Sequence, residues 1–252
     1  MSNYTLFRPQ DREKNFILSV GLTTVKMLFF VVLLIGVAAL GLGVGVGKAW
    51  VDTAPTLDLE VLHSQSQTSF IYDRYGELIT EYKGSENRIY VPLEEVPQNL
   101  IDAIIATEDA RFWEHNGIDI KRIGGALIST FFRGNVQGGS TITCQLIKLT
   151  LLTSDQNFRR KVQEAYLALQ LEDTISKEEI LEEYINIIYL GGSSYGVKIA
   201  ALDYFGKDLN ELTLRECATL AGMIRNPSRY NPRSNYYTRN TPEVTDNRTD
   251  YV

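Results

Sequence analysis

Histidine and cysteine are scarce in this 252-residue sequence, which has two of each. Two thiols do not make a disulfide framework in a chain of this length. Cys144 and Cys217 both fall in apolar helical patterns, where a small buried residue is the commoner role, although in an oxidising compartment the two could pair. With His63 and His115 as the only histidines, the sequence offers no zinc cluster.

The chain also lacks an excess of positive charge, since 25 Lys and Arg stand against 31 Asp and Glu, for a net charge of -6. A nucleic-acid partner normally demands a basic surface, so we expect none. No histidine follows His115, and a hydrolase with a serine nucleophile elbow needs one after its nucleophile. We therefore interpret the GSSYG segment at positions 192–196 as a loop that ends a helix.

Charged residues are absent from positions 27–47. About 20 apolar residues cross a bilayer as a helix. The run is too long for the apolar part of a cleaved signal and has no convincing small-residue cleavage site, so we predict a retained transmembrane helix, with a buried core helix as the alternative. The positive-inside rule places the N-terminus in the cytoplasm and the chain after Trp50 outside, because four basic residues precede the run and one follows closely: Arg8, Arg12, Lys14 and Lys26, then Lys48.

The segments on either side of this run differ in composition. Residues 1–26 form the predicted cytoplasmic tail, and residues 48–68 are polar and irregular, as in a stalk. Between Ser69 and Val91, β-branched and aromatic runs are broken by glycine-containing turns, which predicts a hairpin or a three-stranded piece. Residues 233–252 have no periodicity and look like a linker toward a further C-terminal domain.

Helical signals dominate from Pro97 to about position 232. Two capping boxes open apolar-periodic segments and two glycine or proline signals close them: Ser176-x-x-Glu179, Thr213-x-x-Glu216, Gly191-Gly192 and Asn226-Pro227. The sequence therefore predicts a mainly α domain over residues 69–232, with a small N-terminal β element, preceded by one transmembrane helix.

One acidic residue falls on an apolar helical stripe. Glu108 recurs at helical spacing with large apolar residues: Leu100, Ile101, Ile104, Ile105 and Phe112. A carboxylate on such a face is held short of full solvation, which favours its protonated form and suits it to proton transfer near neutral pH. The alternative is a glutamate at the edge of the stripe that pairs with Arg111 or stays solvated.

The segment QGGSTITCQLIKLTLL, which begins at Gln137, predicts an anion site. Its glycines give a flexible approach, and Ser140 is the expected N-cap of the helix that follows. A helix N-terminus offers unpaired N–H groups and the positive end of the helix dipole. Three polar residues of the segment share one face of that helix: Thr141, Gln145 and Lys148. An ordinary glycine loop before a capped helix is the alternative.

A second acid lies in a helix that opens with basic residues at positions 159–161 and is apolar nearly all round as far as Leu171. Such a helix is central rather than superficial. Glu164 lies within it, and a buried acid must be paired or used in chemistry. A purely structural role would pair it with Arg160, four residues earlier.

Five segments, in this order, resemble the successive motifs of the bacterial peptidoglycan glycosyltransferase domain: EDARFWEHNG, QGGSTITCQL, RRKVQEAYLALQLE, ILEEYINIIYLG and LRECATLAGMIRNPSRYNP. That domain occurs in class A penicillin-binding proteins and in monofunctional transglycosylases. The resemblance runs from about Tyr72 to Pro232. It implies a lysozyme-like, mostly helical fold that polymerises lipid II into glycan strands.

The resemblance also implies roles for individual residues. Glu108 matches the general base that takes the proton from the 4-hydroxyl of the acceptor N-acetylglucosamine. The oxygen then attacks the anomeric carbon of N-acetylmuramic acid on the growing strand, with inversion and loss of undecaprenyl pyrophosphate. Glu164 matches a second catalytic acid that organises the pyrophosphate region, directly or through a divalent cation such as Mg²⁺ or Mn²⁺. The expected substrate-binding residues are Asp109, Phe112, His115, Ser140, Thr141, Gln145, Lys148 and Arg160.

The chain departs from the family pattern at Cys144, where the family usually has the first of two glutamines, while Gln145 retains the second. The S-x-x-K nucleophile of the class A transpeptidase is absent, since no serine is followed by lysine three places on. Residues 124–138 are the expected membrane-facing jaw, although a buried amphipathic helix explains their apolar residues equally well: Leu127, Ile128, Phe131 and Phe132.

The expected partners are lipid II and the growing glycan strand, the bacterial membrane, moenomycin-type inhibitors, and cell-wall synthesis or division proteins. Two other functions compete with polymerisation. The first is a glycan-cleaving enzyme of the same lysozyme-like fold, against which the cationic anion site argues, because a glycosidase has no diphosphate to hold. The second is an inactive, membrane-anchored scaffold that binds wall precursors, against which the presence of both Glu108 and Glu164 argues.

Overall fold

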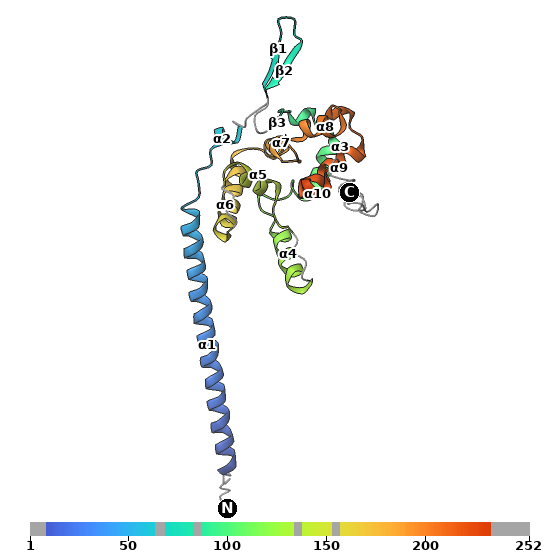
Figure 1. The fold of residues 1–252 in the computed structure, drawn as a ribbon. Helices are drawn as coiled ribbons and strands as arrows, with labels where there is room; N and C mark the ends of the chain where they lie inside the picture. The colour runs from blue at the N-terminus through green and yellow to red at the C-terminus, as the bar shows by residue number, and fades with distance from the viewer. Residues whose placement is uncertain (1–8, 64–68, 83–86, 134–137, 153–156, 233–252) are drawn as a thin grey trace, which may run out of the picture. The chain divides into compact units, whose positions relative to one another are not determined.

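The computed structural model describes residues 9–63, 69–82, 87–133, 138–152 and 157–232 of the chain (Figure 1). The chain divides into two compact units, Met1–Thr53 and Ala54–Val252. The first unit contributes one described helix, and the second contains all the other described elements.

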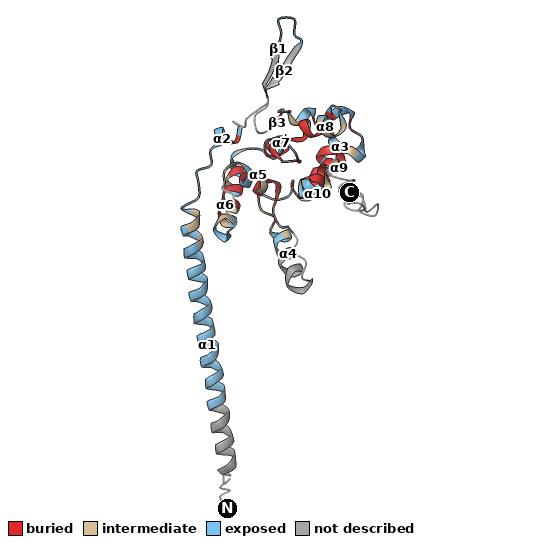
Figure 2. Ribbon diagram, in the orientation of Figure 1, coloured by how far each residue is buried: buried red, intermediate tan, exposed pale blue. Residues whose placement is uncertain are grey.

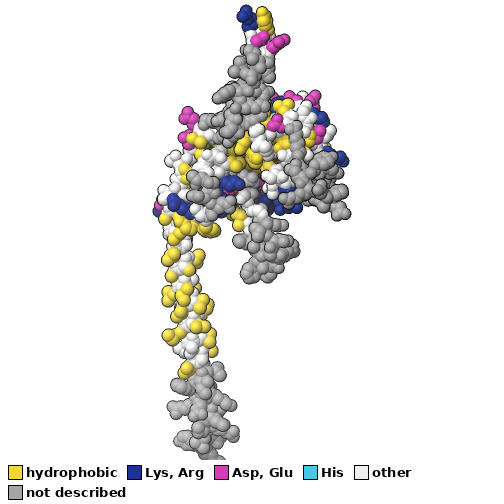
Figure 3. All heavy atoms as spheres, in the orientation of Figure 1, with side chains coloured by type: hydrophobic (Ala, Val, Ile, Leu, Met, Phe, Trp, Pro, Cys, Tyr) yellow, Lys and Arg dark blue, Asp and Glu magenta, His cyan; other side chains and the backbone are white. Residues whose placement is uncertain are grey.

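A single long helix, α1 (Pro9–Val51), forms the described part of the first unit. Its portion Val20–Val51 is long and apolar enough to cross a membrane. The apolar side chains of that portion are exposed, as Figures 2 and 3 show. The predicted span at positions 27–47 lies inside α1, which continues on both sides because no proline interrupts the chain between Pro9 and Pro55. An exposed helix that is apolar all round suits lipid better than a protein core.

The β element at the start of the second unit is a hairpin. β1 (Ser69–Tyr72) pairs antiparallel with β2 (Leu78–Tyr82), and Asp73 closes the turn by accepting hydrogen bonds from two backbone N–H groups at 2.8 Å. β3 (Asn87–Arg88) does not join the hairpin but pairs in parallel with β4 (Ser194–Tyr195). The predicted hairpin is confirmed. The three-stranded alternative is wrong, because β3 pairs with β4 and not with either strand of the hairpin.

Helices form most of the described part of the second unit, which confirms the mainly α prediction. Two short elements come first: α2 (Leu59–His63) and the 3₁₀ turn η1 (Leu93–Glu95). The longer helices and the remaining short ones follow in chain order: α3 (Gln98–Glu108), α4 (Ile120–Arg133), α5 (Ile142–Thr150), α6 (Phe158–Thr174), α7 (Lys177–Ile187), α8 (Val197–Phe205), η2 (Leu209–Glu211), α9 (Leu214–Arg225) and α10 (Pro227–Tyr230).

The hydrophobic core lies between two sets of packed helices (Figures 1 and 2). α3 packs along α9, and α5 packs against both α6 and α7. The buried face of α3 is the predicted stripe: Leu100, Ile101, Ile104 and Ile105. Burial of each such side chain is worth roughly 1.5–3 kcal/mol relative to exposure. This packing holds the C-terminal end of α3 in place, where Glu108 is the last helical residue.

Helix ends follow the sequence signals in most places. Both predicted capping boxes are present, at Ser176 for α7 and at Thr213 for α9, and α9 ends with Asn226 as its C-cap. α7 ends at Ile187, however, four residues before the predicted glycine signal, and Gly191 lies in the turn that leads into β4. The GSSYG segment therefore contains a turn, the short strand β4 and the N-cap of α8, and it does not end a helix.

The prediction for α6 needs correction. Its buried residues lie along one face, which packs against α5: Gln163, Glu164, Leu167, Ala168 and Leu171. Leu169, on another face, is 42% exposed. α6 is therefore an amphipathic helix at the edge of the core and not a helix buried all round, but Glu164 does lie on its buried face.

α4 covers most of the expected jaw at positions 124–138. The side chains of the four residues that carry that prediction lie outside the described residues: Leu127, Ile128, Phe131 and Phe132. The described start of the helix presents Ile120, which is 80% exposed. The membrane-facing role of this segment therefore stays a prediction.

One glycine joins the segment after α3 to α5 and α6. Gly117 has φ +80°, and a Cβ added to it would lie 2.7 Å from the backbone oxygen of Ala168 in α6. Its own carbonyl oxygen accepts a hydrogen bond from the Thr141 hydroxyl at 2.6 Å. Only glycine adopts this backbone conformation readily and allows two backbones to approach so closely.

We expect Gly117→Ala to lower the melting temperature of the full chain in detergent more than Gly206→Ala does. Gly206 is a matched control, because it also has positive φ but no atom within 4 Å of an added Cβ. Left-handed strain alone costs about 1–2 kcal/mol, and steric overlap in a packed site adds about 1–3 kcal/mol. Circular dichroism during heating measures both variants. Equal shifts would show that the contact with Ala168 does not constrain this loop.

Candidate active site

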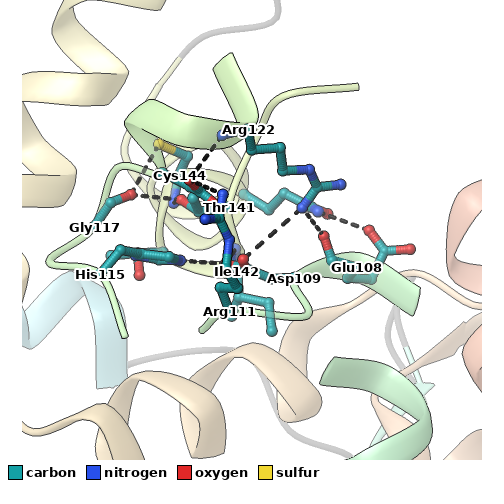
Figure 4. A network of polar contacts seen from close by, with 12 residues as sticks. Glu108, Asp109, Arg111, His115, Gly117, Arg122, Thr141, Ile142 and Cys144 are labelled. Carbon is teal, nitrogen blue, oxygen red and sulfur yellow. Dashed lines mark hydrogen bonds and ion pairs between the residues drawn. The ribbon is translucent and has the colours of Figure 1, made fainter. Parts of the chain in front are cut away.

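Glu108 ends α3, and its half-buried carboxylate faces α5 (Figure 4). Its Oε2 accepts a hydrogen bond from Nε2 of Gln145 at 2.8 Å. Gln145 in turn accepts a hydrogen bond at Oε1 from the hydroxyl of Tyr184 in α7, at 3.0 Å. Glu108 and Gln145 were predicted from the sequence, but Tyr184 was not. Tyr184 lies in an apolar helical pattern, and the two glutamates just before it give no sign of a contact with Gln145.

Asp109 is the C-cap of α3 and is fully buried. Its Oδ2 accepts hydrogen bonds from the backbone N–H of Ile142, the first residue of α5, at 3.0 Å and from Nε2 of His115 at 2.9 Å. Nη1 of Arg122 lies 3.8 Å from its other oxygen. The carboxylate thus joins the end of α3 to the start of α5, where the helix dipole favours a negative charge.

Two arginines follow the glutamate in the chain, Arg111 and Arg122, and both are labelled in Figure 4. Arg122 donates a hydrogen bond from Nη1 to the backbone oxygen of Glu108. Arg111 binds both carboxylate oxygens of Asp119, at 2.5 and 2.6 Å. Burial alone would raise the pKa of Asp119, but hydrogen bonds from the Arg122 backbone and the Arg111 side chain lower it below its usual value. The suggested pairing of Glu108 with Arg111 is therefore wrong, because Arg111 is held by Asp119.

The N-cap of α5 is Thr141 and not Ser140 as predicted. The Thr141 hydroxyl accepts a hydrogen bond from the N–H of Cys144 at 3.1 Å and donates one to the oxygen of Gly117. The helix begins one residue later than predicted because the Thr141 hydroxyl can cap α5 and bind the oxygen of Gly117 together. Thr141 is only 1% exposed, so its contacts are internal.

Two of the backbone N–H groups at the start of α5 are consequently bound by side chains of the protein itself. The N–H of Ile142 binds Asp109, and the N–H of Cys144 binds Thr141. The anion at this helix N-terminus is therefore the carboxylate of Asp109. A substrate anion would have to be held by the cationic side chains near α5 rather than by these two backbone groups.

Ser140 lies just before α5 and contacts the second acid through a lysine. Nζ of Lys161 donates a hydrogen bond to Oγ of Ser140 at 2.7 Å and forms an ion pair with Oε1 of Glu164. The side chain of Glu164 is 2% exposed, whereas that of Lys161 is 50% exposed. The structural partner of Glu164 is thus Lys161, three residues earlier in α6, and not Arg160 as suggested. The i,i+3 spacing allows this pair as well as the i,i+4 spacing allows the other.

The remaining predicted residues lie around these two acids. Lys148 is exposed in the last turn of α5, and Arg160 is partly buried in the first turn of α6. His115 is fixed by Asp109, as described above. Phe112 is fully buried, and Nζ of Lys177 lies 4.3 Å from the centre of its ring. Phe112 therefore packs inside the domain, as part of the hydrophobic core beneath the first motif.

Cys144 and Cys217 are both free and buried, which confirms the interpretation that they are small core residues. Sγ of Cys144 lies 3.6 Å from the oxygen of Gly117, and burial raises the pKa of its thiol. A thiol that stays protonated is a poor nucleophile and a poor metal ligand. Cys144 therefore packs against the Gly117 loop and offers no covalent chemistry of its own.

The described acids of the site were expected to include one ligand of a divalent cation, Glu164. Among the described residues, no group of three or more His, Cys, Asp or Glu is placed to hold a metal ion. Glu164, the residue expected to organise a divalent cation, has one carboxylate oxygen paired with the Lys161 ammonium. Mg²⁺ usually keeps several waters and is bound by one or two carboxylates together with substrate phosphates. A divalent cation at Glu164 therefore stays an expectation from the family resemblance.

The segment from Ser140 to Gln145 links the two acids. One end of the segment contacts Lys161 and through it Glu164, and the other end donates to Glu108. A glutamate that accepts one hydrogen bond and an acid that is paired with a cation thus contact opposite ends of the same short segment. This arrangement can take a proton on one side and balance the charge of an anionic group on the other.

Comparisons with known proteins agree with the resemblance of the motifs. A family model described as "Transglycosylase" matches residues 75–252. "Penicillin-binding protein 1A/1B" of Bacillus subtilis (strain 168) is 46% identical over 212 residues, which cover 83% of this chain and 23% of that protein. "Penicillin-binding protein 1A" of Streptococcus pneumoniae R6 is 42% identical over 234 residues, which cover 92% of this chain and 31% of that protein.

A crystal structure of penicillin-binding protein 1A from Haemophilus influenzae is 34% identical, with a TM-score of 0.34, and the match covers 68% of this chain and 15% of that one. The chain spans between 23% and 31% of the length of the two curated relatives above. The family match includes every described element from α3 onward and with them the whole site, so the chain belongs to the transglycosylase family.

Proposed function

We propose that this chain is a peptidoglycan glycosyltransferase that polymerises lipid II into glycan strands. The observation that carries the proposal is the arrangement around α5, in which Gln145 holds the carboxylate of Glu108 and Lys161 lies between Ser140 and Glu164. Membership of the transglycosylase family supports it. The direct test is to incubate the purified full chain with labelled lipid II and to look for polymer on gels.

In the proposed reaction Glu108 takes the proton from the 4-hydroxyl of the N-acetylglucosamine of lipid II. The resulting oxygen forms a bond to the anomeric carbon of the terminal N-acetylmuramic acid of the growing strand, on the face opposite the leaving group. The bond from that carbon to the undecaprenyl pyrophosphate oxygen breaks, so the configuration inverts. Glu108 is suited to the role because Gln145 binds one of its oxygens and no described residue hydrogen-bonds the other, Oε1.

The leaving group is a diphosphate, and we assign its binding to the cations of α5 and α6. Lys161 is half exposed beside Ser140, Lys148 is exposed, and Arg160 lies one residue before Lys161. Positive charge placed where negative charge develops is the strongest catalytic contribution available to such a site. Glu164 holds Lys161 in position by their ion pair, which gives the second acid a role that needs no proton transfer.

The same cations favour transfer over hydrolysis. In a glycan-cleaving enzyme the leaving group is the neutral hydroxyl of a sugar, and a pair of carboxyl groups flanks the scissile bond. Here the second acid is bound to a lysine rather than open to the first. An inactive scaffold that binds wall precursors would account for the cations but would not need the half-buried acid Glu108.

We further propose that α1 anchors the protein in the bacterial cell membrane, with the N-terminus in the cytoplasm and the second unit outside. The long apolar segment Val20–Val51 and the surplus of basic residues before it support this topology. Lipid II and the growing strand are lipid-linked and would be met at the membrane surface. Moenomycin-type phosphoglycolipids are expected inhibitors, and cell-wall synthesis or division proteins are expected partners.

Glu108→Gln should reduce polymerisation of lipid II about 100-fold or more, because it keeps the shape of the side chain and loses the basic group. The matched control is Glu178→Gln, which removes an exposed acid at the start of α7. Gel analysis of strands made from labelled lipid II measures both variants, and thermal unfolding checks that they fold. Polymer formation near the wild-type rate by Glu108→Gln would reject Glu108 as the base.

Lys148→Ala should weaken the binding of moenomycin about tenfold, since a hydrogen bond to a charged group is worth about 1.5–3 kcal/mol. Lys198→Ala is the control, because it also removes a lysine charge, from a residue in the first turn of α8 that pairs with Asp208. Fluorescence anisotropy with a labelled moenomycin measures the affinity. Unchanged binding together with lost polymerisation would give Lys148 some other role.

Removal of the first unit, residues 1–53, should slow polymerisation on liposomes more than in detergent micelles. The site residues all lie in the second unit, so the chemistry itself should survive. Encounter with lipid II embedded in a bilayer would, however, become a search from bulk water. Rates of the full and shortened chains are compared on both kinds of particle. Equal rates on liposomes would mean that α1 serves only as a tether.

A further inference from the structure

Tyr184 has no direct part in the proposed chemistry, yet only one residue, Gln145, lies between its hydroxyl and the base Glu108. It is on α7, is 0% exposed, and is among the largest fully buried side chains. Its hydroxyl lies 3.0 Å from Oε1 of Gln145, whose Nε2 lies 2.8 Å from Oε2 of Glu108. Three helices, α7, α5 and α3, thus meet through one line of hydrogen bonds.

The direction of each bond in this line follows from the chemistry of the groups. An ionised carboxylate can only accept, so Gln145 must present its NH₂ group to Glu108. The amide oxygen of Gln145 then points to Tyr184, whose hydroxyl must donate. Burial, and next the nearby carboxylates of Glu108 and Asp109, raise the pKa of Tyr184 well above its usual value, so the hydroxyl keeps its proton.

The position of Tyr184 is fixed by the packing and hydrogen bonds of α7. α7 packs along α5, and Asn186, two residues after Tyr184, exchanges hydrogen bonds with both the N–H and the oxygen of Val91 at 2.9 and 2.8 Å. Without the tyrosine hydroxyl, the amide oxygen of Gln145 would lose its hydrogen-bond donor. The Gln145 side chain would then be held at one end only, and the donor to Glu108 would no longer have a fixed position.

We propose that Tyr184 is a positioning residue for the general base: through Gln145 it fixes the orientation of the Glu108 carboxylate, so that Oε2 is bound and Oε1 is presented to the acceptor hydroxyl. The inference rests on the proposed glycosyl transfer. It assigns Tyr184 no contact with substrate. Its prediction is that the tyrosine hydroxyl affects the rate of the chemical step and not the binding of lipid II.

The test begins with Tyr184→Phe in the full chain, which removes only the hydroxyl. We expect kcat for lipid II polymerisation to fall about tenfold with KM unchanged, since misorientation of a catalytic group acts on the reacting state. The acid limb of the pH–rate profile should move to higher pH, because an ionised carboxylate that loses a donor is protonated more readily. The control is Tyr204→Phe, which removes the bond from a tyrosine hydroxyl to the oxygen of Leu190, at 2.8 Å, and should leave both quantities unchanged.

A second variant separates positioning from general support of the fold. If Tyr184 acts through Gln145, then Tyr184→Phe should cause no further loss of kcat in a Gln145→Ala background. Equal losses in the two backgrounds, a change confined to KM, or a wild-type kcat and pH profile in Tyr184→Phe would each overturn the proposal.

One measurement does not depend on activity. NMR of the side-chain amide of Gln145 should show faster proton exchange in Tyr184→Phe than in the wild type, and the same rate in both would contradict the hydrogen-bonded line. Failure of the wild-type protein to polymerise lipid II would instead refute the proposed function. The two failures are thus distinguishable.

Discussion

The buried carboxylate of Asp109 is the constraint on which the site depends. A buried charge is costly unless it is paired and hydrogen-bonded, and this one accepts from the first N–H of α5 and from His115, with Arg122 close to its other oxygen. These bonds fix the end of α3 against the start of α5. Glu108 precedes Asp109 directly, so its reach to Gln145 follows from the same joint.

The two acids of the family motifs are thereby given different environments. Glu108 is half buried and is held by a neutral amide, which leaves it able to exchange a proton. Glu164 is almost fully buried and forms an ion pair with the ammonium group of Lys161, which it thereby holds in position. Environment separates their roles in the mechanism that we propose, one as base and one as an electrostatic support.

Local patterns in the sequence predict much of this structure. The stripe of α3, two capping boxes and the apolar α1 depend on residues close in sequence, and the structure contains all of them. Two of the errors concern contacts between distant segments: Thr141 replaces Ser140 as the cap and also reaches Gly117, and β3 pairs with β4 across more than 100 residues. Tyr184 shows the same limit, since its polar role exists only where α7 meets α5.

The role of Glu108 as the base is tested by a crystal structure of the full chain with a non-reactive lipid II analogue in the acceptor position. We expect the 4-hydroxyl oxygen of the N-acetylglucosamine to lie about 2.6–3.2 Å from Oε1 of Glu108, the separation needed for proton transfer, while Gln145 still binds Oε2. A 4-hydroxyl bound to Glu164, or a Glu108 carboxylate turned away from the sugar, would contradict it.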